Sequence, residues 1–329
     1  MRASVSTAGT QVGVECELTW VARLLAECCG DALEIDQLAT IDTAQLRIRI
    51  ERSRDPFDIG GLAPLTRAAW AGPGELVMLD VCTSGFDLRM RLERGRPVLS
   101  YRWRPPATTR AAVMTLRARF RLLARAALLQ YPAMWFASTR GAVPLHAAVL
   151  SAGGATTLLA GPSGVGKTTV LMREVRKGGV ATSDNLCVSD GTQCWGVVEP
   201  VRAEGATGRR MTHGRRETHL NERVDCLMPD VMVVLRRSVD GALAIRRCSA
   251  GEAARSLASG TYMAGELRRY WAFAATLATA SGLGPAHPAI TETSGLLSRR
   301  LACLEVALPE HCDMRLHEVL ETVERSTCA

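Results

Sequence analysis

Two short runs near the start of the chain alternate between apolar and polar residues, which is the period of strands with one buried face. Residues 20–28, between them, carry apolar side chains at helical spacing, and two later runs also resemble strands. The adjacent prolines Pro105 and Pro106 then disfavour helix and indicate an extended linker. These patterns predict a small α+β domain over residues 1–106, with strands at residues 12–18, 46–51, 76–81 and 86–92.

The apolar pattern lengthens after residue 107. Residues 109–130 place apolar side chains along one helical face, and residues 143–150 form a strand-like run followed by a Gly-rich turn. That turn leads into a short apolar run typical of a buried strand, so the two runs predict an antiparallel hairpin. An α/β domain with a mixed sheet is therefore predicted over residues 107–329, with further elements at residues 155–160, 169–177 and 178–188.

The segment that follows the hairpin matches the phosphate-binding pattern GxxxxGK[ST]. Its glycines let successive backbone N–H groups point into one concavity, where phosphate oxygens bind beside the positive end of a helix. Lys167 would reach the terminal phosphates, and the Thr168 hydroxyl would bind Mg²⁺. The pattern predicts a site for a nucleoside triphosphate such as ATP, with Mg²⁺, made by Gly161, Pro162, Ser163, Gly164, Val165, Gly166, Lys167, Thr168 and Thr169.

Composition strengthens this prediction. Among 40 basic residues only Lys167 and Lys177 are lysines, so a lysine at the phosphate-contact position stands against a strong preference for arginine. The formal charge of +7 comes from arginine doublets spread over the second half of the chain, which is typical of solvated surface. The 11 cysteines contain no CxxC pair, and we interpret them as reduced and mostly buried.

The chain carries no pattern that indicates export or membrane insertion. No apolar run follows Met1 and Arg2, and the longest uncharged stretch, residues 270–290, ends in glycines and prolines that suit a packed helix and turn. The helix at residues 109–130 has a narrow apolar face, which favours docking onto the body of the protein over binding a membrane or nucleic acid. We therefore expect a cytoplasmic protein with neither partner.

Four features occur together in the second domain: the hairpin that carries His146, the phosphate loop, the helix ending Arg176-Lys177-Gly178, and an acid at Asp184. In this combination the chain resembles the HPr kinase/phosphorylase family, and more closely its relatives in modified-peptide pathways, the lasso-peptide precursor kinases. The resemblance has useful motifs over residues 140–205. It implies a P-loop kinase core of the HPr kinase/PEP carboxykinase type, in which Asp184 acts on the hydroxyl that receives the phosphoryl group.

The chain departs from that family at two positions. The family has a second Asp after the first, whereas this chain has Asn185, which keeps an oxygen for Mg²⁺ but carries no charge. Thr169 stands where HPr kinases have Glu, so HPr is not the implied substrate. The resemblance also assigns Glu199 to the metal site and Arg202 to the nucleotide. A basic segment, residues 208–216, is either a lid or peptide-binding loop, or a solvated loop.

The resulting expectation is an ATP- and Mg²⁺-dependent kinase acting on a Ser or Thr hydroxyl of a small precursor peptide or protein. Lys167 would stabilise the transferring charge, Asp184 would orient the hydroxyl and accept its proton, and His146 would have a catalytic or a core role. The alternatives are a kinase of small-molecule hydroxyls and a nucleotide-binding switch. The resemblance implies a recognition role for residues 1–106, and homo-oligomer formation stays open.

Overall fold

The computed structural model describes residues 1–35, 38–206, 208–211, 214–221, 223–310 and 315–325. They form a mixed α/β protein of two compact units. The first unit comprises Met1–Gly141 and Arg269–His287, and the second comprises Ala142–Arg268 and Pro288–Ala329. The chain therefore passes between the units three times.

This division differs from the predicted boundary between residues 106 and 107. The helices that follow Pro106 stay with the first unit because its sheet holds them: the buried Tyr101 hydroxyl donates a hydrogen bond of 2.8 Å to the Ala127 carbonyl. A segment from near the C-terminus joins the same unit, where the rings of Tyr270 and Phe273 pack on Tyr131 with centroids 5.7 and 5.9 Å away. Aromatic packing between segments this distant leaves no trace in local sequence.

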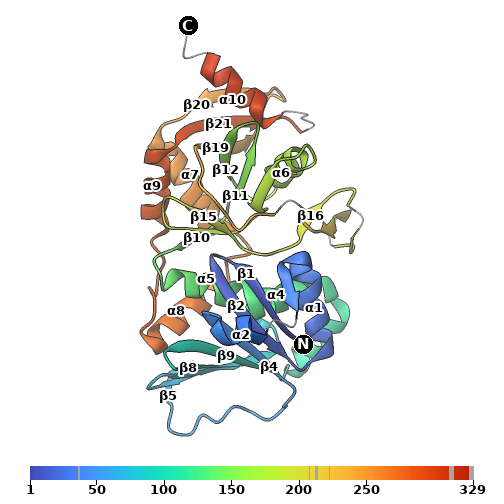
Figure 1. Cartoon of the computed structure of the whole chain (residues 1–329), viewed down its shortest axis with the longest axis vertical. Coiled ribbons are helices and arrows are strands. Elements are labelled where there is room, and N and C mark those ends of the chain that lie inside the picture. The colour runs from blue at the N-terminus through green and yellow to red at the C-terminus, as the bar shows by residue number, and fades with distance from the viewer. Residues whose placement is uncertain (36–37, 207, 212–213, 222, 311–314, 326–329) are drawn as a thin grey trace. The chain divides into compact units, whose positions relative to one another are not determined.

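The first unit is built on one mixed sheet with nine described strands (Figure 1), in the order β3-β1-β2-β4-β9-β8-β7-β6-β5. β4 pairs in parallel with both β2 and β9. All the other neighbouring strands in this order pair in antiparallel fashion. Alternate residues of β4 are buried, which confirms the predicted period. The strands are β1 (Arg2–Thr7), β2 (Thr10–Cys16), β3 (Leu33–Ile35), β4 (Leu46–Glu51), β5 (Ala63–Thr66), β6 (Ala69–Gly72), β7 (Glu75–Met78), β8 (Phe86–Glu93) and β9 (Arg96–Trp103).

The predicted helix at residues 109–130 is divided in the structure. Leu116 leaves the helical region with φ −114° and ψ 47°. A π-helical turn at Ala126–Gln130 then leads into α5 (Tyr131–Ser138), which continues the helix beyond the predicted end. The predicted helix at residues 20–28 is confirmed as α1. The helices of this unit are α1 (Thr19–Cys29), α2 (Leu38–Thr43), α3 (Ala107–Thr115), α4 (Arg117–Arg125), α5 (Tyr131–Ser138) and α8 (Tyr270–Ser281).

The second unit contains a mixed sheet with six described strands, in the order β13-β11-β12-β19-β21-β20. β11 and β12 form the predicted antiparallel hairpin, and β12, β19 and β21 run parallel to one another. Parallel strands end at the same edge, so the loop after β12 lies beside the end of β19. The strands are β11 (Ala148–Ala152), β12 (Ala155–Ala160), β13 (Val180–Ser183), β19 (Val231–Arg237), β20 (Ala244–Arg247) and β21 (Ala302–Leu308).

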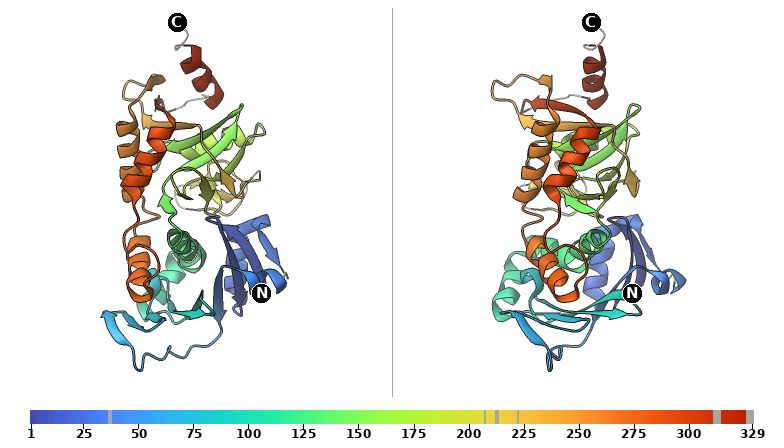
Figure 2. Two further views of the ribbon diagram at one scale, coloured as in Figure 1. Left: turned by 60° about the vertical axis from the view of Figure 1, so that its left-hand side comes forward. Right: turned by 90° about the vertical axis from the view of Figure 1, so that its left-hand side faces the viewer.

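Helices cover both faces of this sheet (Figures 1 and 2). α6 (Lys167–Val175) lies on one face, and α7 (Ala250–Met263) and α9 (Ile290–Arg300) lie on the other. Leu171 of α6 and Val319 of α10 (Leu316–Arg325) share one buried cluster with Leu150 and Val233 of the sheet. α7 begins at a capping box, in which Ser249 and Glu252 satisfy each other's backbone N–H groups. Both helix layers therefore have defined starting points against the sheet.

Two smaller sheets complete the second unit. A four-stranded sheet has the order β10-β14-β15-β18, and β16 pairs with β17 alone. The predicted strands at residues 143–150 and 178–188 are each divided between sheets, which is a correction to the sequence analysis. No described helix has the length and apolar content needed to cross a bilayer. The strands are β10 (Val143–Leu145), β14 (Cys187–Ser189), β15 (Cys194–Gly196), β16 (Val201–Ala203), β17 (Arg216–Thr218) and β18 (Cys226–Leu227).

Candidate functional site

The predicted phosphate loop connects β12 to α6. Gly161 has φ +144°, and a Cβ there would lie 2.7 Å from the Leu235 carbonyl oxygen of β19, so only glycine fits. Gly166 has φ +118° and forms the N-cap of α6. Val165 is buried and anchors the loop, whereas Pro162, Ser163 and Gly164 are exposed. The loop thus presents backbone at the start of a helix, as phosphate binding requires.

Lys167 is the first residue of α6 and is only 4% exposed. Its Nζ donates hydrogen bonds to the carbonyls of Gly161 at 2.8 Å and Pro162 at 3.2 Å. Burial lowers the pKa of Lys167 to about 8, and the charges of Asp184 and Glu266 partly oppose that shift. A lysine with these partners lies against the loop and near two acids, where it can neutralise phosphate charge.

His146 and Asp184 occupy the two bends at which the chain passes between sheets. β11 pairs with β13 in the six-stranded sheet, and β10 pairs with β14 in the four-stranded sheet. His146 follows β10, and Asp184 follows β13, on segments that run antiparallel on both sides of the bend. The division of the predicted strands therefore brings these two side chains to the same place in the fold.

Asp184 is the most enclosed acid of this region, at 1% exposed. Burial raises its pKa, and a hydrogen bond from Thr168 and the charges of Arg202 and Lys167 partly oppose the rise. The Asn185 amide nitrogen donates to Oδ2 at 3.1 Å. The buried Oδ1 of Asp184 has no partner of ordinary hydrogen-bond geometry among the described residues. A carboxylate oxygen in this state fits a site that receives a proton or a cation.

His146 is 1% exposed, and its backbone N–H donates to the Thr261 hydroxyl of α7 at 3.1 Å. Burial and then the charge of Lys167 lower the pKa of the ring to about 4, although Glu266 and the Gly260 carbonyl act in the opposite direction. The ring is therefore neutral near pH 7. A neutral imidazole suits hydrogen bonding or a proton-relay role better than charge stabilisation.

Arg202 enters the site from the β16–β17 ribbon, and its Nη2 lies 2.9 Å from Oε1 of Glu266. Burial works against the charge of Arg202, but Glu199 and Glu266 offset it, so its pKa stays above the ordinary value. Arg202 in turn lowers the pKa of Glu266 despite the burial of that acid. Sequence reasoning missed Glu266, which lies in the connection after α7 and carries no motif.

The structure thus brings together five of the predicted residues, Asn185 is hydrogen-bonded to one of them, Asp184, and Glu266 joins the group. Thr169 is exposed on α6, and Glu199 reaches the group through its charge on Arg202. The basic segment at residues 208–216 includes residues 212–213, which lie outside the described residues; its end enters β17. The residues brought together are His146, Lys167, Thr168, Asp184 and Arg202.

These residues fit a magnesium ion that arrives with a nucleotide better than a resident metal. Among the described residues, no three His, Cys, Asp or Glu side chains lie close enough together to hold a metal ion. Mg²⁺ needs only one or two protein oxygens when phosphates supply the rest. Thr168 and Asp184 offer a hydroxyl and a carboxylate side by side, and Asn185 adds an amide oxygen.

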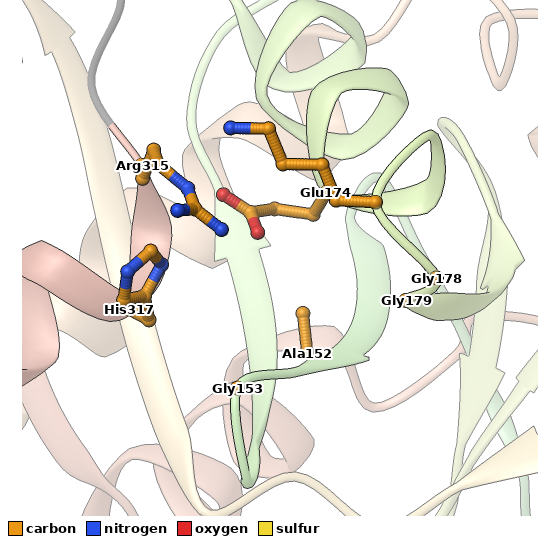
Figure 3. Close-up of a pocket in the computed structure, with 8 residues that line it drawn as sticks. Ala152, Gly153, Glu174, Gly178, Gly179, Arg315 and His317 are labelled. Carbon is orange, nitrogen blue, oxygen red and sulfur yellow. The ribbon is translucent and has the colours of Figure 1, made fainter.

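A cavity of about 200 Å³ lies at the other end of α6 (Figure 3). It is lined by the β11–β12 turn, the end of α6 and the start of α10. Oε1 of Glu174 accepts a hydrogen bond from the Leu316 N–H at 2.8 Å, and the Arg315 guanidinium points toward the Glu174 carboxylate. Because the charges of Glu174 and Arg315 face each other across it, we interpret this cavity as part of the packing contact between α6 and α10.

Comparison with known proteins adds no relative to this description. No model of a protein family matches the chain, and no curated protein matches its sequence.

Proposed function

We propose that this protein is an ATP- and Mg²⁺-dependent kinase that phosphorylates a Ser or Thr hydroxyl of a small precursor peptide or protein. Its second unit would be a P-loop kinase core of the HPr kinase/PEP carboxykinase type. The observation that carries the proposal is a buried carboxylate, Asp184, held beside both Lys167 and Thr168 of a phosphate loop. A nucleotide switch also holds a carboxylate beside the loop Thr, as a support for Mg²⁺. The feature of Asp184 that favours a proton acceptor is its enclosure together with its raised pKa.

The phosphate loop and Lys167 would hold and neutralise the terminal phosphates. ATP with Mg²⁺, when bound, supplies the phosphoryl group and a positive charge between its oxygens. Backbone N–H groups at the start of α6 would orient that group, and Lys167 would exchange its carbonyl contacts for phosphate oxygens. Thr168 and Asn185 would hold the metal ion, and Glu199, which the resemblance assigns to the metal, would act through its charge on Arg202.

Asp184 would align the acceptor hydroxyl and take its proton. Its raised pKa favours that role, because a carboxylate with a higher pKa is a stronger base once ionised. The charges of Arg202 and Lys167 oppose that rise in pKa and so favour the ionised form of Asp184. His146, neutral and buried, would shape the site or relay a proton.

Intact-mass measurement tests this proposal directly. The protein is incubated with Mg²⁺-ATP and a panel of Ser- and Thr-containing peptides, beside Asp184→Asn and Lys167→Met variants. We expect a phosphate on some peptides, and a loss of rate of about a hundredfold or more for Lys167→Met. Lys177→Met is the matched control, because the only other lysine lies at the far end of α6.

The other outcomes of the same experiment have distinct meanings. Phosphate gained by a low-mass alcohol or amino acid, with every peptide unchanged, would indicate a small-molecule kinase. Steady release of ADP that no acceptor accelerates would indicate a nucleotide switch. Transfer that survives both Asp184→Asn and Lys167→Met would contradict the assigned site.

A further inference from the structure

The contact between Arg202 and Glu266 joins a small ribbon to the helical layer of the second unit. Their side chains are 22% and 27% exposed, and the nitrogen and oxygen lie 2.9 Å apart. Charge-assisted hydrogen bonds of this kind are among the stronger polar contacts in proteins. The pair therefore fixes a guanidinium whose other charged neighbours are Glu199 and Asp184.

The backbone of Arg202 belongs to a short ribbon with a single pairing strand. β16 has three residues and pairs with β17 alone, in the register Arg202↔Glu217. Among the described residues, Glu266 accepts the one hydrogen bond that the Arg202 side chain donates. An arginine has five N–H donors, so the remaining donors of Arg202 stay available to a phosphate.

Glu266 is fixed by the fold on both sides. Ala264 and Leu267 are buried at 2% and 0% exposed, and the Leu267 N–H donates to the Ala264 carbonyl at 3.1 Å. This turn ends α7, which packs against β12 and β19. Glu266 thus extends from a buried turn of the unit toward a residue on a two-stranded ribbon.

The position of the pair relates it to the terminal phosphate. β16, which carries Arg202, packs against α6, the helix that begins at Lys167. In agreement with that packing, the charges of Arg202 and Glu266 influence the pKa values of both Asp184 and His146. Lys167 is the residue that reaches the terminal phosphates in such loops. A guanidinium in this group therefore lies at the end of the site that distinguishes a triphosphate from a diphosphate.

We propose that Glu266 is a positioning residue that holds the Arg202 guanidinium toward the terminal phosphate of the nucleotide. This inference rests on the nucleotide site of the proposed function, but it does not require phosphoryl transfer to any acceptor. It also gives the chain a second site carboxylate, which the uncharged Asn185 does not supply. Glu266 reaches the nucleotide only through Arg202.

Calorimetric titration with MgATP and with MgADP tests the inference in four proteins: wild type, Glu266→Gln, Arg202→Met and the double variant. We expect Glu266→Gln to weaken MgATP binding about tenfold and to leave MgADP binding within about twofold. If Glu266 acts through Arg202, the double variant binds MgATP no more weakly than Arg202→Met alone. Glu292→Gln, at an exposed acid of α9, is the matched control.

Several results would overturn the inference. They are MgATP affinity unchanged in Glu266→Gln, equal losses for MgATP and MgADP, or single-variant losses that add in the double variant. Thermal unfolding of each variant checks its fold, and Glu266→Asp replaces Glu266→Gln should that variant unfold. If the four proteins bind MgATP as expected but the wild type phosphorylates no acceptor, the kinase proposal fails and the role of Glu266 stands. Wild-type protein that binds no nucleotide would overturn both.

Discussion

The ionisation of each buried group in the site depends on its immediate neighbours, and His146 shows how this affects the stability of the folded protein. The ring is enclosed beside Lys167, and both burial and that charge lower its pKa to about 4 from an ordinary value of 6.5. The unfolded chain therefore binds a proton between these pH values that the folded protein does not. By linkage, the folded state loses stability as the pH falls from 6.5 toward 4.

We expect the His146→Gln variant to be less sensitive to acid than the wild type. Lowering the pH from 7 to 5 should reduce the unfolding free energy of the wild type by about 1 to 2 kcal/mol more than that of the variant. Urea unfolding at the two pH values measures the difference. His219→Gln is the control, because His219 is exposed in the same unit. An equal acid sensitivity of wild type and His146→Gln would show that the ring is not buried in its neutral form.

At the scale of elements, the end of β19 is tied to the phosphate loop. Arg237 donates a hydrogen bond from Nη2 to the Gly164 carbonyl at 3.1 Å, whereas its neighbour Arg236 pairs with Glu305 of β21 at 2.8 Å. Both arginines are exposed, and of the two only Arg237 has a hydrogen bond to the loop. The strand beside the loop thus contributes a restraint on an otherwise exposed turn.

We expect Arg237→Ala to raise the KM for ATP about three- to tenfold, because one exposed hydrogen bond stabilises the loop by about 1 kcal/mol. Arg236→Ala removes an arginine of the same strand without touching the loop and should leave that KM unchanged. Steady-state kinetics over a range of ATP concentrations compare the two. Should both substitutions raise KM equally, the cause would be the general loss of positive charge.

The elements also show which parts of the site local sequence can predict. The phosphate loop was predictable because its glycines, Lys167 and Thr168 are neighbours in sequence, and the structure places them between β12 and α6. The bends at His146 and Asp184 were not, because apolar residues lie on both sides of each bend, and only pairing with two different sheets divides each strand. Glu266 was not predictable because its partner Arg202 is 64 positions away.

At the scale of the whole molecule, the two units do not correspond to two continuous stretches of chain. Residues 269–287 leave the second unit, supply α8 to the first, and return. Deletion of residues 1–106 would therefore remove the nine-stranded sheet and keep the helices that pack on it. Trp135 and Phe273, each 1% exposed, would lose their buried surroundings.

A two-part excision should instead give a folded second unit. Deleting residues 1–141 and replacing residues 269–287 with a flexible Gly/Ser linker keeps every residue of the candidate site. We expect this protein to unfold cooperatively and to bind MgATP within about threefold of the full chain, since its core is its own. Deletion of residues 1–106 should give an aggregated product, because exposed aromatic surface drives association.

Kinetics of the excised unit would then assign a role to the first unit. If the nine-stranded unit recognises the acceptor, its removal should raise the KM for a peptide substrate at least tenfold while ATP binding and slow ADP release persist. An unchanged peptide KM would place recognition within the second unit, beside Arg202 and Asp184. If the excised unit fails to fold while the full chain is stable, the two cores depend on each other. The two compact units are then not independent domains.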